Sequence, residues 1–185
     1  MFPVRALFEL ASFNAGVDFR GVDFGGGADF DGARFDKGAD FTEASFRQSA
    51  NFNSTSFSKV ADFRSASFRM NANFNSTSFS GDTNFRSVSF SGGSDFRSAS
   101  FSGEAFFKEA LFKDYVYFEG QPKRKGSCDQ TRLIFQSANF EKSDRVSFHT
   151  LDLRPHWFVN VDTRKFVFTD VEFNVCLQQI GLTWG

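Results

Sequence analysis

The chain has 185 residues, a net charge of −1, and 30 phenylalanines against two tyrosines and two tryptophans. Residues 1–60, 61–127 and 128–185 carry six, nine and six basic residues against eight, seven and seven acidic ones. No segment therefore has the basic field of a nucleic-acid-binding protein, or a strongly acidic one. Two cysteines form no disulfide framework, and no apolar run has the length of a membrane span or the character of a signal peptide. We expect a cytoplasmic protein.

From Phe8 to Phe118, a phenylalanine recurs at steps that alternate strictly between five and six residues. A small residue, most often alanine, stands two positions before each one. This period fits neither a helix nor a plain alternating strand, and it marks a repeat architecture. In Ala61-Asp62-Phe63, the Ala and Phe point to one side of an extended segment and the Asp to the other. Each unit is therefore predicted to be a short strand and a turn, and successive units to coil into an all-β solenoid.

The length of one coil has two readings. Five plus six residues give an 11-residue period, and a coil could hold one such period or two. The sequence ANFNSTSFS occurs at 50–58 and again at 72–80, whereas the copy between them, ADFRSASFR, matches less well. This favours a 22-residue coil with four faces, although duplication of a gene unit of the same length would leave the same trace.

The repeat resembles that of the pentapeptide-repeat proteins, through ADFTE at 39–43, ANFNS at 50–54, ADFRS at 61–65 and ANFNS at 72–76. The resemblance implies a right-handed quadrilateral β-helix, with the Phe and the small residue two before it inside. The sixth residue in every second unit departs from the family pattern and affects the corners. The predicted structural core includes Phe19, Phe41, Phe52, Phe63, Phe74, Phe85 and Phe96.

Four parts are predicted along the chain. Residues 1–118 form the regular solenoid, and residues 119–132 form a basic, irregular loop. Residues 133–173 continue the solenoid in degenerate form, and residues 174–185 are a C-terminal cap or a truncated tail. Because Phe140 follows Phe118 at the spacing of one such coil, the column of phenylalanines is expected to resume there.

Two kinds of outward ladder are predicted. Asp or Asn precedes every second Phe, and short side chains of this kind bond the nearby backbone at corners. Their positions fall in two columns on opposite faces of a 22-residue coil: Asp18, Asp29, Asp40, Asn51, Asp62, Asn73, Asn84 and Asp95. A further column follows the Phe of one face and is a candidate interaction stripe for phosphate or an acidic partner. It is also explained as a device that protects sheet edges and keeps the rod soluble. Its basic members are Arg20, Arg64, Arg86 and Lys108.

Catalytic chemistry is not indicated. The two histidines, His149 and His156, and the two cysteines have no metal-site spacing. Gly25-Gly26-Gly27 is not followed by the Lys-Ser/Thr of a phosphate loop and is assigned to a corner. Acids on the solenoid should face solvent, where nothing raises a pKa for acid catalysis. We predict no enzyme, no cofactor, no metal and no small-molecule substrate.

Three functions remain. The first is a structural scaffold module that presents flat faces to a protein partner, since solenoids offer extended surfaces. The second is an accessory domain of a membrane-associated bacterial protein, because the segment at 151–173 resembles the C-terminal part of larger family members. The third is implied only by the resemblance, since some members of that family mimic DNA and bind gyrase, and the charge of this chain argues against it. Pairing with a second copy through a solenoid end is also compatible with the repeat.

Overall fold

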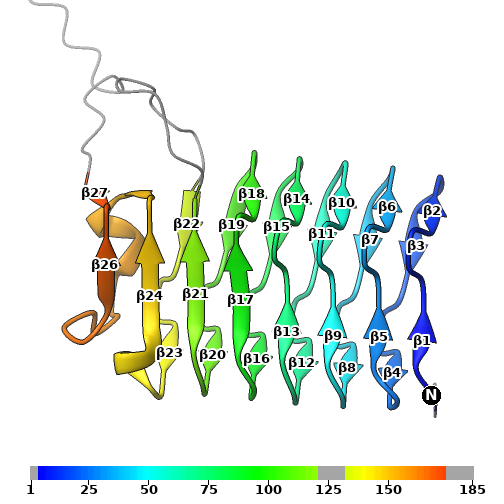
Figure 1. Ribbon diagram of the computed structural model, residues 1–185, viewed down its shortest axis with the longest axis horizontal. Coiled ribbons are helices and arrows are strands. Elements are labelled where there is room, and N and C mark those ends of the chain that lie inside the picture. Colours follow the sequence, from blue (N-terminus) through cyan, green and yellow to red (C-terminus); the bar gives the residue numbers. More distant parts are fainter. Residues whose placement is uncertain (1–3, 121–131, 174–185) are drawn as a thin grey trace, which may run out of the picture.

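The computed structural model describes residues 4–120 and 132–173. They wind into a four-sided rod of about seven turns, in which every strand pairing is parallel (Figure 1). The N-terminus lies at one end of the rod, and sheet A faces the viewer in Figure 1. Sheet A contains β1 (Ala6–Leu7), β5 (Ala28–Asp29), β9 (Ala50–Asn51), β13 (Ala72–Asn73), β17 (Ser94–Arg97), β21 (Val116–Glu119), β24 (Val146–His149) and β26 (Val167–Thr169).

The other faces are formed by three further sheets. Sheet B contains β2 (Ser12–Phe13), β6 (Arg34–Phe35), β10 (Ser56–Phe57), β14 (Ser78–Phe79) and β18 (Ser100–Phe101). Sheet C contains β3 (Val17–Asp18), β7 (Ala39–Asp40), β11 (Ala61–Asp62), β15 (Thr83–Asn84), β19 (Glu104–Phe106) and β22 (Arg132–Ile134). Sheet D contains β4 (Asp23–Phe24), β8 (Ser45–Phe46), β12 (Ser67–Phe68), β16 (Ser89–Phe90), β20 (Leu111–Phe112) and β23 (Asn139–Phe140).

The strand register fixes the length of a regular coil. Ala28 pairs with Ala50 in sheet A, and Ala39 pairs with Ala61 in sheet C. Partners on neighbouring coils are thus 22 positions apart, as are Asn51 and Asp29, whose side chains bond each other. Each regular coil therefore holds two of the predicted periods and four short strands. This confirms the all-β solenoid and settles the choice between the two coil lengths.

Five- and six-residue units make different corners. A five-residue unit ends in a tight turn. In the unit at 61–65 this turn runs from Phe63 to Ala66, and the Ala66 amide donates to the Phe63 carbonyl at 3.1 Å. Ser65, the third residue of this turn, has φ +55°. A positive φ at that position defines a type II turn. Most six-residue units turn through bends, but the one that contains Gly25-Gly26-Gly27, which lies at a corner as predicted, is also closed by a turn hydrogen bond, from the Gly27 amide to the Phe24 carbonyl at 3.2 Å.

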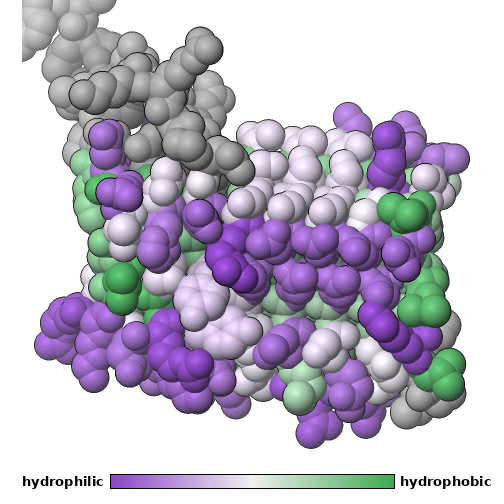
Figure 2. Space-filling view, in the orientation of Figure 1, coloured by the Kyte–Doolittle hydropathy of each residue, from purple (hydrophilic) through white to green (hydrophobic). Residues whose placement is uncertain are grey.

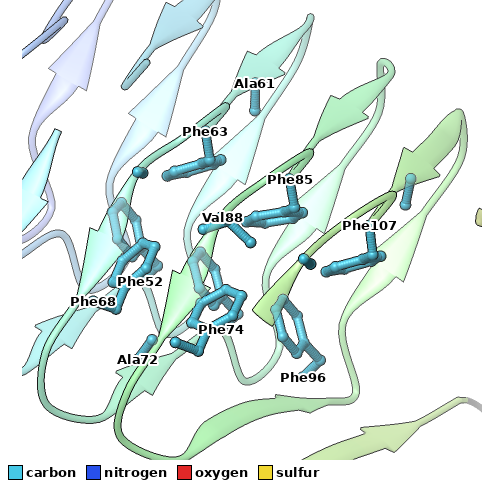
Figure 3. Close-up of a cluster of buried hydrophobic side chains, with 14 of the residues drawn as sticks. Phe52, Ala61, Phe63, Phe68, Ala72, Phe74, Phe85, Val88, Phe96 and Phe107 are labelled. Atoms are coloured by element: carbon cyan, nitrogen blue, oxygen red, sulfur yellow. The ribbon is translucent and has the colours of Figure 1, made fainter. Parts of the chain in front are cut away.

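The core consists of phenylalanine columns. Phe52, Phe74 and Phe96 form one column, and Phe63, Phe85 and Phe107 form the facing one (Figure 3). Six of the seven predicted core residues are completely or almost completely buried. The exception is Phe19, which is only partly buried because it belongs to the first coil and has no coil before it among the described residues.

The solenoid continues beyond the region of strict repeats, with a changed register. Phe140 stacks on Phe112 at 4.8 Å, and Phe118 stacks on Phe148 at 5.2 Å. The prediction that Phe140 resumes the column of Phe118 is therefore wrong. The step along the chain from Phe112 to Phe140 is longer than one regular coil, because the segment after β21 is longer than a regular face and displaces the repeat.

The last part of the rod is less regular. The helical segments among the described residues are two short 3-10 helices, η1 (Ser143–Arg145) and η2 (Pro155–Phe158), and a fifth sheet pairs β25 (Asp152–Leu153) with β27 (Glu172–Phe173). Phe158 of η2 stacks on Phe135 at 5.3 Å and so prolongs the sheet C column without a strand. The predicted loop reaches into β21 and β22 at its ends, but most of it, together with the predicted tail, lies outside the described residues.

Candidate functional site

The interior of the regular coils is occupied by aromatic rings. Phe41 contacts Phe52 edge-on at 5.6 Å across the rod, and Phe63 contacts Phe74 in the same way at 5.7 Å. Phenylalanine rings offer no ionisable group, so any recognition chemistry of these coils must come from side chains on the four outer faces.

The Asx ladders have a structural role. All eight side chains accept a hydrogen bond from the backbone amide two residues later, as from Arg64 to Asp62 at 3.0 Å. Some also bond along sheet A, where Asn73 donates to Asn51 at 3.0 Å and Asn51 donates to Asp29 at 2.9 Å. These bonds satisfy backbone donors at the corners, as short Asx side chains commonly do.

The candidate basic stripe lies along sheet C, but its charges are largely compensated. Arg20 contacts Asp18 at 2.6 Å, and Arg64 contacts Asp62 at 2.9 Å. Hydrogen bonding from Arg20 lowers the pKa of Asp18 to about 2. The other two members also have partners, since the Arg86 guanidinium lies 4.1 Å from the ring centre of Phe106 and Lys108 lies 3.8 Å from Glu109. The structure thus aligns the four residues as predicted, but as paired charges rather than as a free positive row.

A group of aromatic and basic side chains on sheet A was not predicted. Tyr115 and Tyr117, the two tyrosines of the chain, stack at 5.0 Å. Arg97 lies 5.6 Å from the centre of the Tyr117 ring, and Arg145 lies 5.5 Å from that of Tyr115. We call Arg97, Tyr115, Tyr117 and Arg145 the tyrosine–arginine patch. Figure 2 shows this side of the rod, where a hydrophilic band follows sheet A.

Local packing holds the patch in place. A Cβ added at Gly93 would lie 1.9 Å from the Tyr115 ring, so the ring lies directly over this glycine. Burial raises the pKa of the Tyr115 hydroxyl above its ordinary value. Arg145 also pairs with Asp114, which Lys142 approaches at 3.3 Å. The sequence did contain a signal, because Tyr117 stands where the four preceding coils of sheet A place Asp or Asn.

The described residues hold no cluster of metal ligands and no membrane-spanning helix. Among residues 4–120 and 132–173, no three His, Cys, Asp or Glu side chains gather closely enough to hold a metal ion. His149 lies in β24 and His156 in η2, while both cysteines fall outside the described residues. No helix in the described part of the chain is long and apolar enough to cross a membrane.

Four parallel sheets, a 22-residue coil and columns of stacked Phe define the class of the protein as a four-sided β-solenoid. A family model described as pentapeptide repeats (9 copies) matches residues 5–45, 41–89 and 74–120. The chain therefore belongs to the pentapeptide-repeat family, as the sequence predicted. A comparison with curated proteins found no match.

Proposed function

We propose that the protein is a non-catalytic scaffold module that binds a protein partner through sheet A. The tyrosine–arginine patch is the observation that supports this proposal. Tyr and Arg are enriched at the energetic centres of protein interfaces. Both rings are held by stacking and by neighbouring guanidinium groups, so little conformational entropy is lost when a partner covers them.

The surroundings of the patch suit an interface. Beside the patch on sheet A, the side chains of Asn73, Asn51 and Asp29 are hydrogen-bonded to one another from coil to coil. This part of the sheet therefore offers a partner a surface with few flexible charged side chains. A polar rim around an aromatic centre is the usual arrangement of transient protein interfaces. Sheet C also has a guanidinium over an aromatic ring, Arg86 over Phe106, but it contains neither of the two stacked tyrosines.

The experiment compares two matched substitutions. Arg97 and Arg64 occupy equivalent units, each paired with an aspartate two residues earlier. Protein retained from a lysate of the source cells by immobilised wild-type chain is identified and quantified. Retention of the specific partner should fall at least tenfold with Arg97→Ala, should fall further when Tyr117→Ala is added, and should be unchanged with Arg64→Ala.

Two results would contradict the proposal. Loss of the partner with Arg64→Ala alone would move the interface to sheet C. Equal retention by all variants would show that the tyrosine–arginine patch is not the binding site. The alternative function, an accessory domain of a membrane-associated protein, rests on the C-terminal resemblance alone. We propose a cytoplasmic location, because a chain with only two cysteines suits a reducing compartment.

A further inference from the structure

One column of residues on sheet A runs through the tyrosine–arginine patch. It consists of the residue that directly precedes the inward-facing position of each strand, and on four successive coils it holds Asn71, Gly93, Tyr115 and Arg145. Each member contacts the next. The Gly93 amide donates to Asn71 Oδ1 at 3.1 Å, the Tyr115 ring lies over Gly93, and the Arg145 guanidinium lies over that ring. Gly93 is buried, and the ring of the following coil covers it.

The backbone at this position does not require a glycine. The two preceding coils of sheet A hold Ser49 and Asn71 there. Gly93 has no positive φ, unlike Gly27 of the second coil, whose φ is +90°. A Cβ added at Gly93 would meet the Tyr115 ring, with Cζ, Cε1 and Cε2 at 1.9, 2.2 and 2.5 Å. The glycine is therefore needed for the ring of Tyr115 and not for the path of the chain.

The place of this ring joins the patch into one series. The Tyr115 ring stacks on Tyr117 at 5.0 Å. Arg97 lies against Tyr117 and Arg145 against Tyr115, so four planar groups follow one another across three coils. If the Tyr115 ring were turned away, Tyr117 would lose its stacked partner and Arg145 its ring. A preorganised surface loses less conformational entropy on binding than a mobile one, so this change would weaken an interface.

We propose that Gly93 is a positioning residue of the tyrosine–arginine patch, and that partner binding through sheet A depends on the space it leaves for the Tyr115 ring. The inference rests on the proposed function, because it concerns the same patch. It adds that the partner contacts the two stacked tyrosines as a unit. The Ser94 amide donates to the Tyr115 carbonyl at 2.9 Å, which fixes the backbone beside the contact. A methyl group at position 93 must therefore displace the ring, which is the free end of a rotatable side chain.

The first test needs no partner. Tyr117→Phe leaves Tyr115 as the only tyrosine of the chain, so the absorbance of the ionised phenol follows this hydroxyl alone during a pH titration. Burial raises the pKa of Tyr115 when its ring lies over Gly93. Gly93→Ala should lower this pKa towards the ordinary value of about 10, because the displaced ring is exposed to water. An unchanged pKa would overturn the inference and would leave the proposed function standing.

Gly38→Ala is the matched control. Gly38 takes the same place before β7 of sheet C, and it also has no positive φ. A Cβ added there would have its nearest contact at 3.7 Å, with the Val60 carbonyl oxygen, which is an ordinary packing distance. This variant shows what alanine does to a unit when no ring lies over the position. The pKa of Tyr115 and the retention of the partner should both stay unchanged.

The second test uses the protein that the immobilised wild-type chain retains from the lysate. Gly93→Ala should lower its retention at least tenfold. In a chain that already carries Tyr115→Ala, the same change should alter retention less than twofold, because there is no ring to displace. An equal loss in both backgrounds would mean that Gly93 acts through the coil and would overturn the inference. Full retention by Gly93→Ala would also overturn it, whereas failure of the proposed function is recognised separately, by full retention with Arg97→Ala.

Discussion

The rings of Phe41 and Phe63 lie 4.8 Å apart and within 2° of parallel. This separation equals the distance between neighbouring strands of a sheet, and Ala39 and Ala61, two residues before these rings, are paired in sheet C. The backbone ladder thus sets the stacking distance. Each ring also meets Phe52 edge-on, at 5.6 and 5.5 Å, in the geometry that aromatic pairs prefer. The core is therefore a column of rings packed on two sides, in which removal of one ring would leave a cavity.

The first prediction compares the inside and the outside of one unit. Phe63→Ala empties a completely buried site and should lower the free energy of unfolding by about 3–5 kcal/mol. Arg64→Ala removes an exposed side chain whose ion pair contributes little, and it should change stability by no more than about 0.5 kcal/mol. Denaturant unfolding of both variants measures the difference. Similar effects would mean that the two faces are assigned wrongly.

The second prediction concerns two buried threonines in positions that most units fill with alanine. The Thr77 hydroxyl donates to the Phe52 carbonyl at 2.7 Å, whereas the Thr83 hydroxyl has no hydrogen-bond partner among the described residues. Thr77→Val should therefore cost about 1 kcal/mol through the lost hydrogen bond. Thr83→Val should raise stability by about 1–2 kcal/mol, because it removes a buried polar group without a partner. Thermal unfolding of the two variants measures both effects. Destabilisation by Thr83→Val would contradict the prediction.

The third prediction concerns the tight corners. Ser65 has a positive φ, in the position that Gly21 and Gly32 fill in earlier units. A β-branched residue suffers most from this conformation, so Ser65→Val should cost about 1–3 kcal/mol. Ser65→Gly relieves the strain but frees the unfolded chain, and should stay within about 1 kcal/mol of wild type. A corner that accepts valine at no cost would show that the turn is not of type II.

The fourth prediction is that the purified protein leaves DNA gyrase supercoiling unchanged at micromolar concentration. A mimic of DNA must present rows of free carboxylates. Here Asp18 and Asp62 are each bonded to an arginine of the same unit, which would face the cations of the enzyme. Potent inhibition, abolished when Asp18, Asp40 and Asp62 are neutralised to Asn, would overturn this prediction and favour mimicry over the scaffold.

The sequence predicted the regular coils well because each unit repeats the same local rule. In Ala-x-Phe the alternation of an extended chain sends Ala61 and Phe63 inward whatever lies elsewhere. The pairing of Asp62 with Arg64 follows from the same alternation, since residues two apart share a face, and it could have been foreseen. The position of Phe140 could not, because it depends on how many residues separate β21 from β22, where the repeat resumes. The tyrosine–arginine patch joins Arg97 to Arg145, which belong to different coils, and only the register of the later coils defines such a contact.

The length of the coil underlies the assignment of every face. The direct measurement is disulfide formation between pairs of introduced cysteines, in a chain that carries Cys128→Ser and Cys176→Ser. Ser67 and Ser89 are paired neighbours in sheet D, whereas Ser78 belongs to sheet B on the opposite side. Neighbouring strands lie close enough for a disulfide between their Cα positions. The chain with Ser67→Cys and Ser89→Cys should therefore form an intramolecular disulfide on mild oxidation, and the chain with Ser67→Cys and Ser78→Cys should not. A disulfide in the second chain and none in the first would contradict the 22-residue coil.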